Sequence, residues 1–247
     1  MLGIKEVDAK EITGKISLAR FSSLKHWGID KILNGIEKFY KVTMPSTSFS
    51  EKKQYLITSF RGKSPKYKNG TNRIILNQKC NRWNYIDERY AKTVDEEWYD
   101  SLPYDVFLQE NDIIINSTGE GTLGRASLVT SKHVGSLVDS HVLVLRLNTN
   151  YVLPELIVRQ INSKFGQQQV HLLKGAQATN QTELGIDNLL KMKFIIPLDN
   201  AGKPDLAKQR DIFKEILQFE KAIENLNAKA KTLDVQAKKD FENAIFN

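Results

Sequence analysis

The sequence of 247 residues predicts an α+β fold, in which a mixed, β-rich globular body is followed by a long C-terminal coiled-coil helix. Between residues 55 and 147, short extended apolar segments alternate with loops that contain Gly, Pro or Asn, a pattern typical of strands. After Pro204 the chain contains neither Gly nor Pro, and its apolar residues recur every three or four positions, as in a helix. We therefore expect a globular domain over residues 1–200 and a long helix over residues 201–247.

Residues 1–50 are expected to form an N-terminal helical segment that packs on the main body. The stretch "SSLKHWGIDKILNGI" offers a serine as a helix cap, and Pro45 with its Ser/Thr-rich surroundings ends the helix. The apolar positions at helical spacing in this stretch are Leu24, Trp27, Ile32, Leu33 and Ile36.

The body is expected to be built mainly from strands. The strand-like segments are, in order, "YLITSF", "RIILN", "DIIIN", "ASLV" and "HVLVLRL". We expect a short helix at "VDEEWYDSL" and one longer helix at "LPELIVRQINSKFGQQQV", with Pro154 in its first turn. The segment "IDNLLKMKFIIPL" predicts a helical turn followed by a closing strand.

The C-terminal segment carries a heptad seam. Its apolar residues follow one another by steps of four and three, in the order Ile212, Ile216, Phe219, Ile223, Leu226, Ala230, Leu233 and Ala237. About 35 helical residues at 1.5 Å each form a rod of about 50 Å. An amphipathic helix lying on its own domain is the alternative, but the sustained 3.5-residue period favours pairing with another helix. Residues 199–247 hold nine acids and nine bases, and this neutrality favours a protein partner.

Composition excludes several classes of protein. No apolar run approaches the roughly 18 residues of a membrane span, and the charged N-terminus does not fit a signal peptide, so we expect a cytoplasmic protein without membrane contact. Cys80 is the single cysteine, and the four histidines are scattered without metal-ligand spacing. We expect neither a disulfide nor a structural metal.

Positive charge is concentrated in one block. Residues 52–92 contain eleven Lys or Arg against two acids, with six Phe, Tyr or Trp residues interleaved, and this predicts a surface for a polyanion. A solvated basic face whose aromatic side chains point inward is the alternative. The next block, residues 93–112, holds seven acids and no Lys or Arg, and a folded domain could place the two blocks on opposite faces.

A glycine motif raises the possibility of a nucleotide enzyme. Gly119, Gly121 and Gly124 have the G-x-G-x-x-G spacing, apolar residues 113–115 precede them, and Asp139 follows about twenty residues later. The motif needs a helix after its last glycine, yet "ASLVTS" reads as a strand. We therefore interpret the glycines as a hairpin loop. The chain also lacks a P-loop, a G-x-S-x-G elbow and an H-E-x-x-H helix, so we expect no catalytic site and no cofactor in it.

Several of these segments together resemble the DNA specificity (S) subunit of type I restriction-modification systems. The segments are "GKSPKY", "ILNQKCNRWNYID", "ENDIIINSTGEGTLGRASLV", "SHVLVLRL", "IIPL", "KQRDIFKEI" and "FEKAIENL", in order over about residues 55–230. Members of this family usually carry two target recognition domains and two long spacer helices. This chain has one of each and no internal repeat, so it resembles a half-length S subunit.

The resemblance implies a DNA-binding protein without chemistry of its own. A target recognition domain grips one half of a split site on double-stranded DNA, and the long helices pair antiparallel and dock methyltransferase subunits. S-adenosylmethionine is then expected in the methyltransferase, and a restriction subunit is a further possible partner. Because one chain supplies one long helix, we expect a C2 homodimer paired through residues 212–237.

Four groups of residues are candidates for DNA contact because they combine cations with hydrogen-bonding side chains. The first, in loop 62–71, comprises Lys63, Ser64, Lys66, Tyr67, Lys68 and Asn69. The second comprises Lys79, Asn81, Arg82 and Trp83, and the third, in the glycine loop, Ser117, Thr118, Thr122 and Arg125. The fourth, in "LLKGAQATNQT", comprises Lys174, Gln177, Asn180 and Gln181.

Two other functions remain open at this level. One is a non-catalytic protein-interaction or assembly module with an incidental basic patch, which retained binding to heparin but not to DNA, without sequence preference, would favour. The other is a nucleotide-dependent enzyme acting through the glycine loop, for which a bound nucleotide should raise the melting temperature.

Overall fold

The computed structural model describes residues 27–119, 121–176 and 182–246. At its centre lies a four-stranded antiparallel sheet in the order β2-β8-β5-β6. Its strands are β2 (Leu56–Arg61), β5 (Ile113–Asn116), β6 (Ala126–Leu128) and β8 (Val142–Leu147). The five segments predicted to be strands are confirmed, and "RIILN" forms β3 (Ile74–Leu76) in a neighbouring sheet.

The two central strands, β5 and β8, are apolar at every position except Asn116 and Arg146, because both faces of the sheet are covered. Alternate side chains of a strand point to opposite faces. Ile113 and Ile115 therefore join the larger core cluster, whereas Ile114 joins a second cluster around Cys80. All three isoleucines are fully buried.

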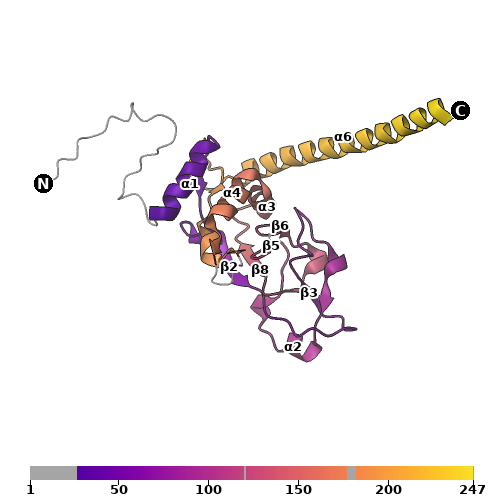
Figure 1. Cartoon of the computed structure of the whole chain (residues 1–247). Coiled ribbons are helices and arrows are strands. Elements are labelled where there is room, and N and C mark those ends of the chain that lie inside the picture. The colour runs from indigo at the N-terminus through magenta and orange to yellow at the C-terminus, as the bar shows by residue number, and fades with distance from the viewer. Residues whose placement is uncertain (1–26, 120, 177–181, 247) are drawn as a thin grey trace, which may run out of the picture.

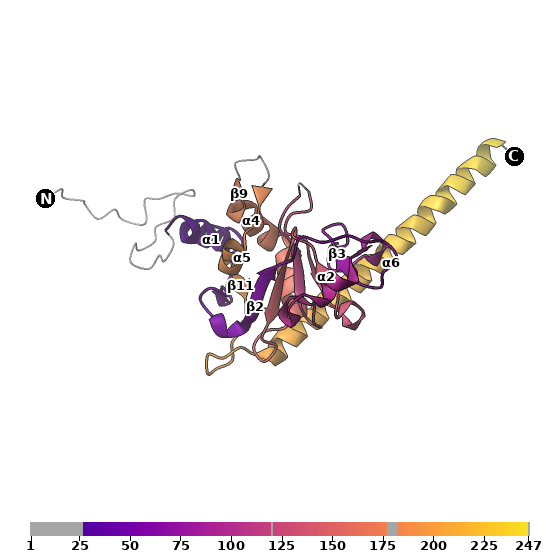
Figure 2. The same ribbon diagram turned by 90° about the horizontal axis from the view of Figure 1, so that it is seen from below.

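Helices cover one side of the sheet, as Figure 2 shows for α1, α4 and α5 beside β2. The elements of this layer are α1 (Trp27–Phe39), α3 (Pro154–Asn162), α4 (Lys164–Leu173) and α5 (Ile186–Lys191), with β1 (Ser46–Thr47) paired to β11 (Phe194–Ile195). The expected N-terminal helix is present from Trp27, and Leu33 and Ile36 bury its inner face. Leu24 lies outside the described residues.

The expectation of one helix over residues 154–170 is wrong. Ser163 adopts an extended backbone, and its hydroxyl accepts a hydrogen bond from the backbone N–H of Gly166 (3.2 Å). It therefore ends α3 and caps the N-terminus of α4. A Cβ on Gly166 would lie 2.1 Å from the carbonyl oxygen of Gln160, so the close approach of the two helices requires glycine.

A smaller sheet lies on the other side of the central sheet (Figure 2). It consists of β4 (Lys92–Thr93), β3 and β7 (Leu137–Val138), with β3 and β7 parallel. The predicted short helix is α2 (Glu96–Asp100), which begins where the Asp95 carboxylate accepts a hydrogen bond from the N–H of Trp98 (3.0 Å).

The C-terminal helix α6 (Leu206–Phe246) projects from the body as a single rod (Figure 1). It begins five residues later than expected, after Asp205, whose carboxylate accepts from the N–H of Lys208 (2.9 Å). The first turns are fixed to the body: Gln209 bonds to the backbone of residues 151 and 153, and Arg159 of α3 pairs with Glu220 (3.0 Å). Every described residue from 221 onward is exposed. The alternative of a helix lying along its own domain thus holds only for the first four turns.

None of the helices in the described part of the chain combines the length and the apolar character that a membrane span requires.

Candidate nucleic-acid interface

The glycine loop connects two antiparallel strands, as expected for a hairpin. β5 pairs with β6, with Ile115 opposite Ala126, and no helix follows the glycines. Gly119, Gly121 and Gly124 all have positive φ, at 96°, 76° and 76°. The loop therefore lacks the helix N-terminus that holds a pyrophosphate in a dinucleotide-binding turn.

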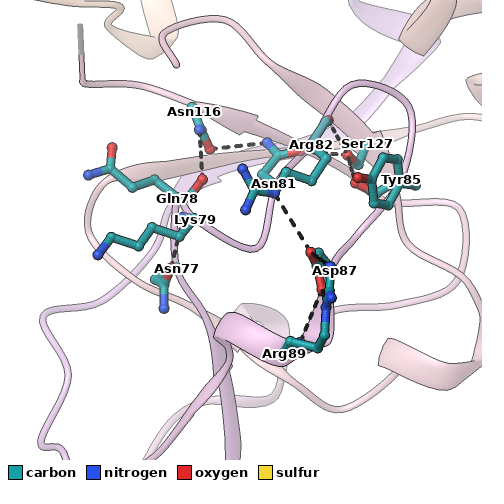
Figure 3. A network of polar contacts seen from close by, with 10 residues as sticks. All are labelled: Asn77, Gln78, Lys79, Asn81, Arg82, Tyr85, Asp87, Arg89, Asn116 and Ser127. Carbon is teal, nitrogen blue, oxygen red and sulfur yellow. Dashed lines mark hydrogen bonds and ion pairs between the residues drawn. The ribbon is translucent and has the colours of Figure 1, made fainter. Parts of the chain in front are cut away.

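The loop between β3 and β4, residues 77–91, is fixed by side-chain hydrogen bonds to its own backbone (Figure 3). The Asn77 side chain accepts from the N–H of Lys79 (2.8 Å) and donates to the carbonyl of Tyr90 (2.6 Å). The N–H of Asp87 donates to the carbonyl of Cys80 (2.8 Å), which closes the inner part of this loop, residues 80–87.

Asn81 is buried beneath this loop, which corrects its expected role. Its side chain is fully inaccessible, and its amide donates to the carbonyl oxygens of Ile114 (3.1 Å) and Arg125 (2.8 Å). Its Oδ1 accepts from the hydroxyl of Ser127 (2.5 Å). Asn81 thus ties the loop to β5 and β6, and in this conformation it cannot contact a base edge.

The other members of the second group differ in availability. Lys79 is exposed, and Trp83 is 43% exposed with the Arg125 guanidinium 5.5 Å from its ring centre. Arg82 is half-buried over the Tyr90 ring (4.7 Å). Lys79 and Trp83 are therefore the members of this group whose side chains are exposed and available for contact with a partner.

Cys80 belongs to the same loop, and its thiol is buried and unreactive. Burial raises the pKa of its thiol to about 11, so the thiol is protonated at neutral pH. A protonated, inaccessible thiol is a poor nucleophile and a poor metal ligand. Within the described residues, no group of three or more His, Cys, Asp or Glu side chains is arranged to hold a metal ion.

Loop 62–71 begins where β2 passes close to the turn between β7 and β8. A Cβ on Gly62 would lie 2.2 Å from the carbonyl oxygens of Val138 and Asp139, so glycine is needed there. The loop then leads outward, and all its candidate side chains are exposed: Lys63, Ser64, Lys66, Tyr67, Lys68 and Asn69.

The acidic block lies against this basic loop and not on the opposite face. Lys68 pairs with Asp95 (2.8 Å), and Arg73 pairs with Asp100 of α2 (3.1 Å). The hydrogen bond from Lys68 lowers the pKa of Asp95, and the same contact raises the pKa of Lys68. Lys68 is therefore partly neutralised by its own chain. Within the described residues Lys63 and Lys66 form no ion pair with an acid, so they are the better candidates in this loop for contact with a phosphate.

The structure brings three of the four groups together through direct contacts. Asn116, at the end of β5, donates to the carbonyl of Gln78 (3.0 Å), and this joins the glycine loop to loop 77–91. The hydroxyl of Thr118 lies 2.9 Å from Nδ1 of His141, which follows the turn that contacts Gly62. The sequence predictions omitted Gln78 and His141, although Gln78 directly precedes Lys79.

The fourth group is described only in part. Lys174 is half-buried, and Gln177, Asn180 and Gln181 lie outside the described residues. The flanking strands β9 (Gly175–Ala176) and β10 (Thr182–Glu183) are antiparallel. Their position is fixed near the glycine loop, because Leu184 donates to the carbonyl of Ser117 (2.8 Å) and Glu183 pairs with Arg61.

The heptad seam of α6 divides into two parts. Ile212 and Ile216 are half-buried near the body. The remaining six residues are exposed, and the large ones are Phe219 (63%), Ile223 (57%), Leu226 (66%) and Leu233 (59%). We refer to residues 219–237 of this seam as the exposed seam.

Comparisons with known proteins identify the architecture. Neither a protein-family model nor a curated protein sequence matches the chain. The HsdS subunit from Thermoanaerobacter tengcongensis matches over 82% of this chain and 47% of its own, with a TM-score of 0.56 and 16% identity. A chain from a study of the assembly and conformational transition of the type I R-M system matches over 81% and 48%, with a TM-score of 0.52 and 15% identity. The chain therefore has the fold of type I restriction-modification S subunits and spans about half the length of these solved chains.

Proposed function

We propose that this chain is a DNA specificity subunit of a type I restriction-modification complex. In this role its globular domain reads one half of a bipartite site on double-stranded DNA, and α6 pairs with a second copy and docks methyltransferase subunits. The observation that carries the proposal is the convergence of three polar loops, with exposed Lys63 and Lys79 and the partly exposed Arg125, on a domain with the S-subunit fold.

The charge and chemistry of these loops suit a nucleic acid. Lysines neutralise phosphates and supply the salt-dependent part of the affinity, and exposed Trp83 and Tyr67 add flat apolar surface. The methyl donor, S-adenosylmethionine, then binds to the methyltransferase, and a restriction subunit joins the same complex.

The exposed seam supports a dimer. A row of large apolar side chains open to water along a projecting helix is unfavourable unless another surface covers it. A second copy paired along the exposed seam would supply a second recognition domain and a second long helix.

One observation favours the assembly module as a second candidate. Lys68 and Arg73 are already paired with acids of the chain, which reduces the net charge of the basic block. Binding to heparin but not to DNA, without sequence preference, would support this second function.

The test is a map of DNA methylation in cells with this gene and in cells from which it has been deleted. The proposed function predicts that one split sequence motif loses its methylation on deletion and regains it when the gene is restored. An unchanged methylation map would contradict it.

A further inference from the structure

Gln78 lies where two loops of the candidate interface meet. Its backbone is fixed, because its carbonyl accepts a hydrogen bond from the Asn116 side chain (3.0 Å). In addition, the N–H of Lys79, which follows it, donates to the side chain of Asn77, which precedes it. Its side chain leaves this network: Figure 3 shows Gln78 and Lys79 pointing to the same side, away from Asn81. A fixed backbone whose side chain is not bound into the network is the arrangement that a recognition residue needs.

The side-chain amide of Gln78 is held under the glycine loop without a hydrogen bond at its oxygen. The Oε1 atom is inaccessible to water and has no hydrogen-bond partner among the residues that the structure describes. It occupies the space beside Gly119, where a Cβ would lie 2.8 Å from it. The loop accommodates the amide because Gly119, with φ of 96°, carries no side chain. A buried acceptor without a partner is unfavourable. The amide therefore has no hydrogen bond at this oxygen to lose when it turns outward.

The chemistry of the amide and its neighbours indicates a ligand. A glutamine amide presents a donor and an acceptor side by side, which match N7 and N6 of adenine in the major groove. Exposed Lys79 follows it directly, and Arg125, whose Nη2 donates to the carbonyl of Gly121 (3.0 Å), lies in the facing loop. Both cations belong to the two loops that meet at Gln78, and Lys and Arg are the residue types that neutralise DNA phosphates.

We propose that Gln78 determines specificity by reading an adenine in each half-site. On DNA binding its amide leaves the space beside Gly119, and its unpaired oxygen then accepts from adenine N6 while its nitrogen donates to N7. This inference rests on the proposed function and adds to it one base position and the residue that reads it.

The test replaces the chromosomal gene with Gln78→Met and maps methylation in the same cells. Methionine has a similar length and buries no unpaired acceptor, so the variant should melt at or above the temperature of the unmodified protein. We expect the preference for adenine to fall by roughly 5- to 150-fold at one position of each half-site, with every other position unchanged. The matched control, Lys79→Met, should lower methylation at all sites alike without changing the motif.

A second variant keeps the test independent of folding effects. Gln78→Glu presents only acceptors, which suit the N4 amino group of cytosine, so the preferred base should change from adenine to cytosine. If deletion of the gene abolishes the motif but both Gln78 variants leave every base preference intact, the inference is overturned and the proposed function stands. If deletion leaves the methylation map unchanged, both are overturned.

Discussion

Replacing Phe219, Ile223 and Leu226 by Asp should convert the protein from a dimer to a monomer. Complete burial of a side chain of this kind contributes about 1.5–3 kcal/mol, and these three are 57–66% exposed in the single chain. Pairing therefore recovers about 1–2 kcal/mol for each side chain, or about 6–12 kcal/mol over the six in a dimer. Loss of only about 6 kcal/mol weakens association about 10⁴-fold.

Sedimentation velocity between about 1 and 100 μM measures this effect, a range that brackets a dimer of micromolar affinity. The control is Val235→Asp, because Val235 is 60% exposed on the same projecting helix but lies off the exposed seam. The control should remain a dimer. A monomeric parent protein, both alone and with its methyltransferase, or a triple variant that still dimerises, would refute pairing through the exposed seam.

Three further results are expected. Asn81→Leu leaves buried carbonyl groups unpaired and should lower the free energy of unfolding, measured in urea, by about 3 kcal/mol. The control Asn69→Ala changes an exposed side chain and should alter this free energy by less than about 0.5 kcal/mol. Equal effects of the two variants would contradict the structural role of Asn81. Burial raises the pKa of Asp139, so its contribution to stability is present below the unfolded-state pKa near 3.8 and is lost as pH rises through the folded-state pKa. Asp139→Asn should therefore reduce the fall in melting temperature with rising pH. Parallel pH dependences for the two proteins would contradict this prediction. Lys63→Met and Lys79→Met should each weaken binding to all duplexes and reduce the salt slope of log K by about 0.9, and an unchanged slope in anisotropy titrations would exclude a phosphate contact.

The elements that sequence predicts well are those fixed by local patterns. The strands at 113–116 and 142–147 are apolar at every position or nearly so, because the sheet is covered on both sides. The long helix follows from its heptad spacing and the lack of Gly and Pro after Pro204. The hairpin at the glycine loop follows from the strand-like residues after Gly124.

Features that depend on distant residues are harder to predict. Asn81 is a residue type expected in an exposed loop, but it is buried because its acceptors lie 33 and 44 residues further along the chain. The pairing of the acidic block with the basic loop likewise joins positions 27 residues apart. The break at Ser163 depends on one side-chain cap within an otherwise continuous helical pattern.

The symmetry of the methylated motif tests the central claim most directly, because a homodimer presents two identical recognition domains related by a two-fold axis. Mapping methylation in cells that carry this gene as the sole source of S subunit should reveal one split motif. Its two halves should be inverted copies of one sequence at a fixed spacing, and both should disappear with the gene. A motif with two unrelated halves would contradict the homodimer, and the absence of any motif that depends on the gene would contradict the proposed role in DNA recognition.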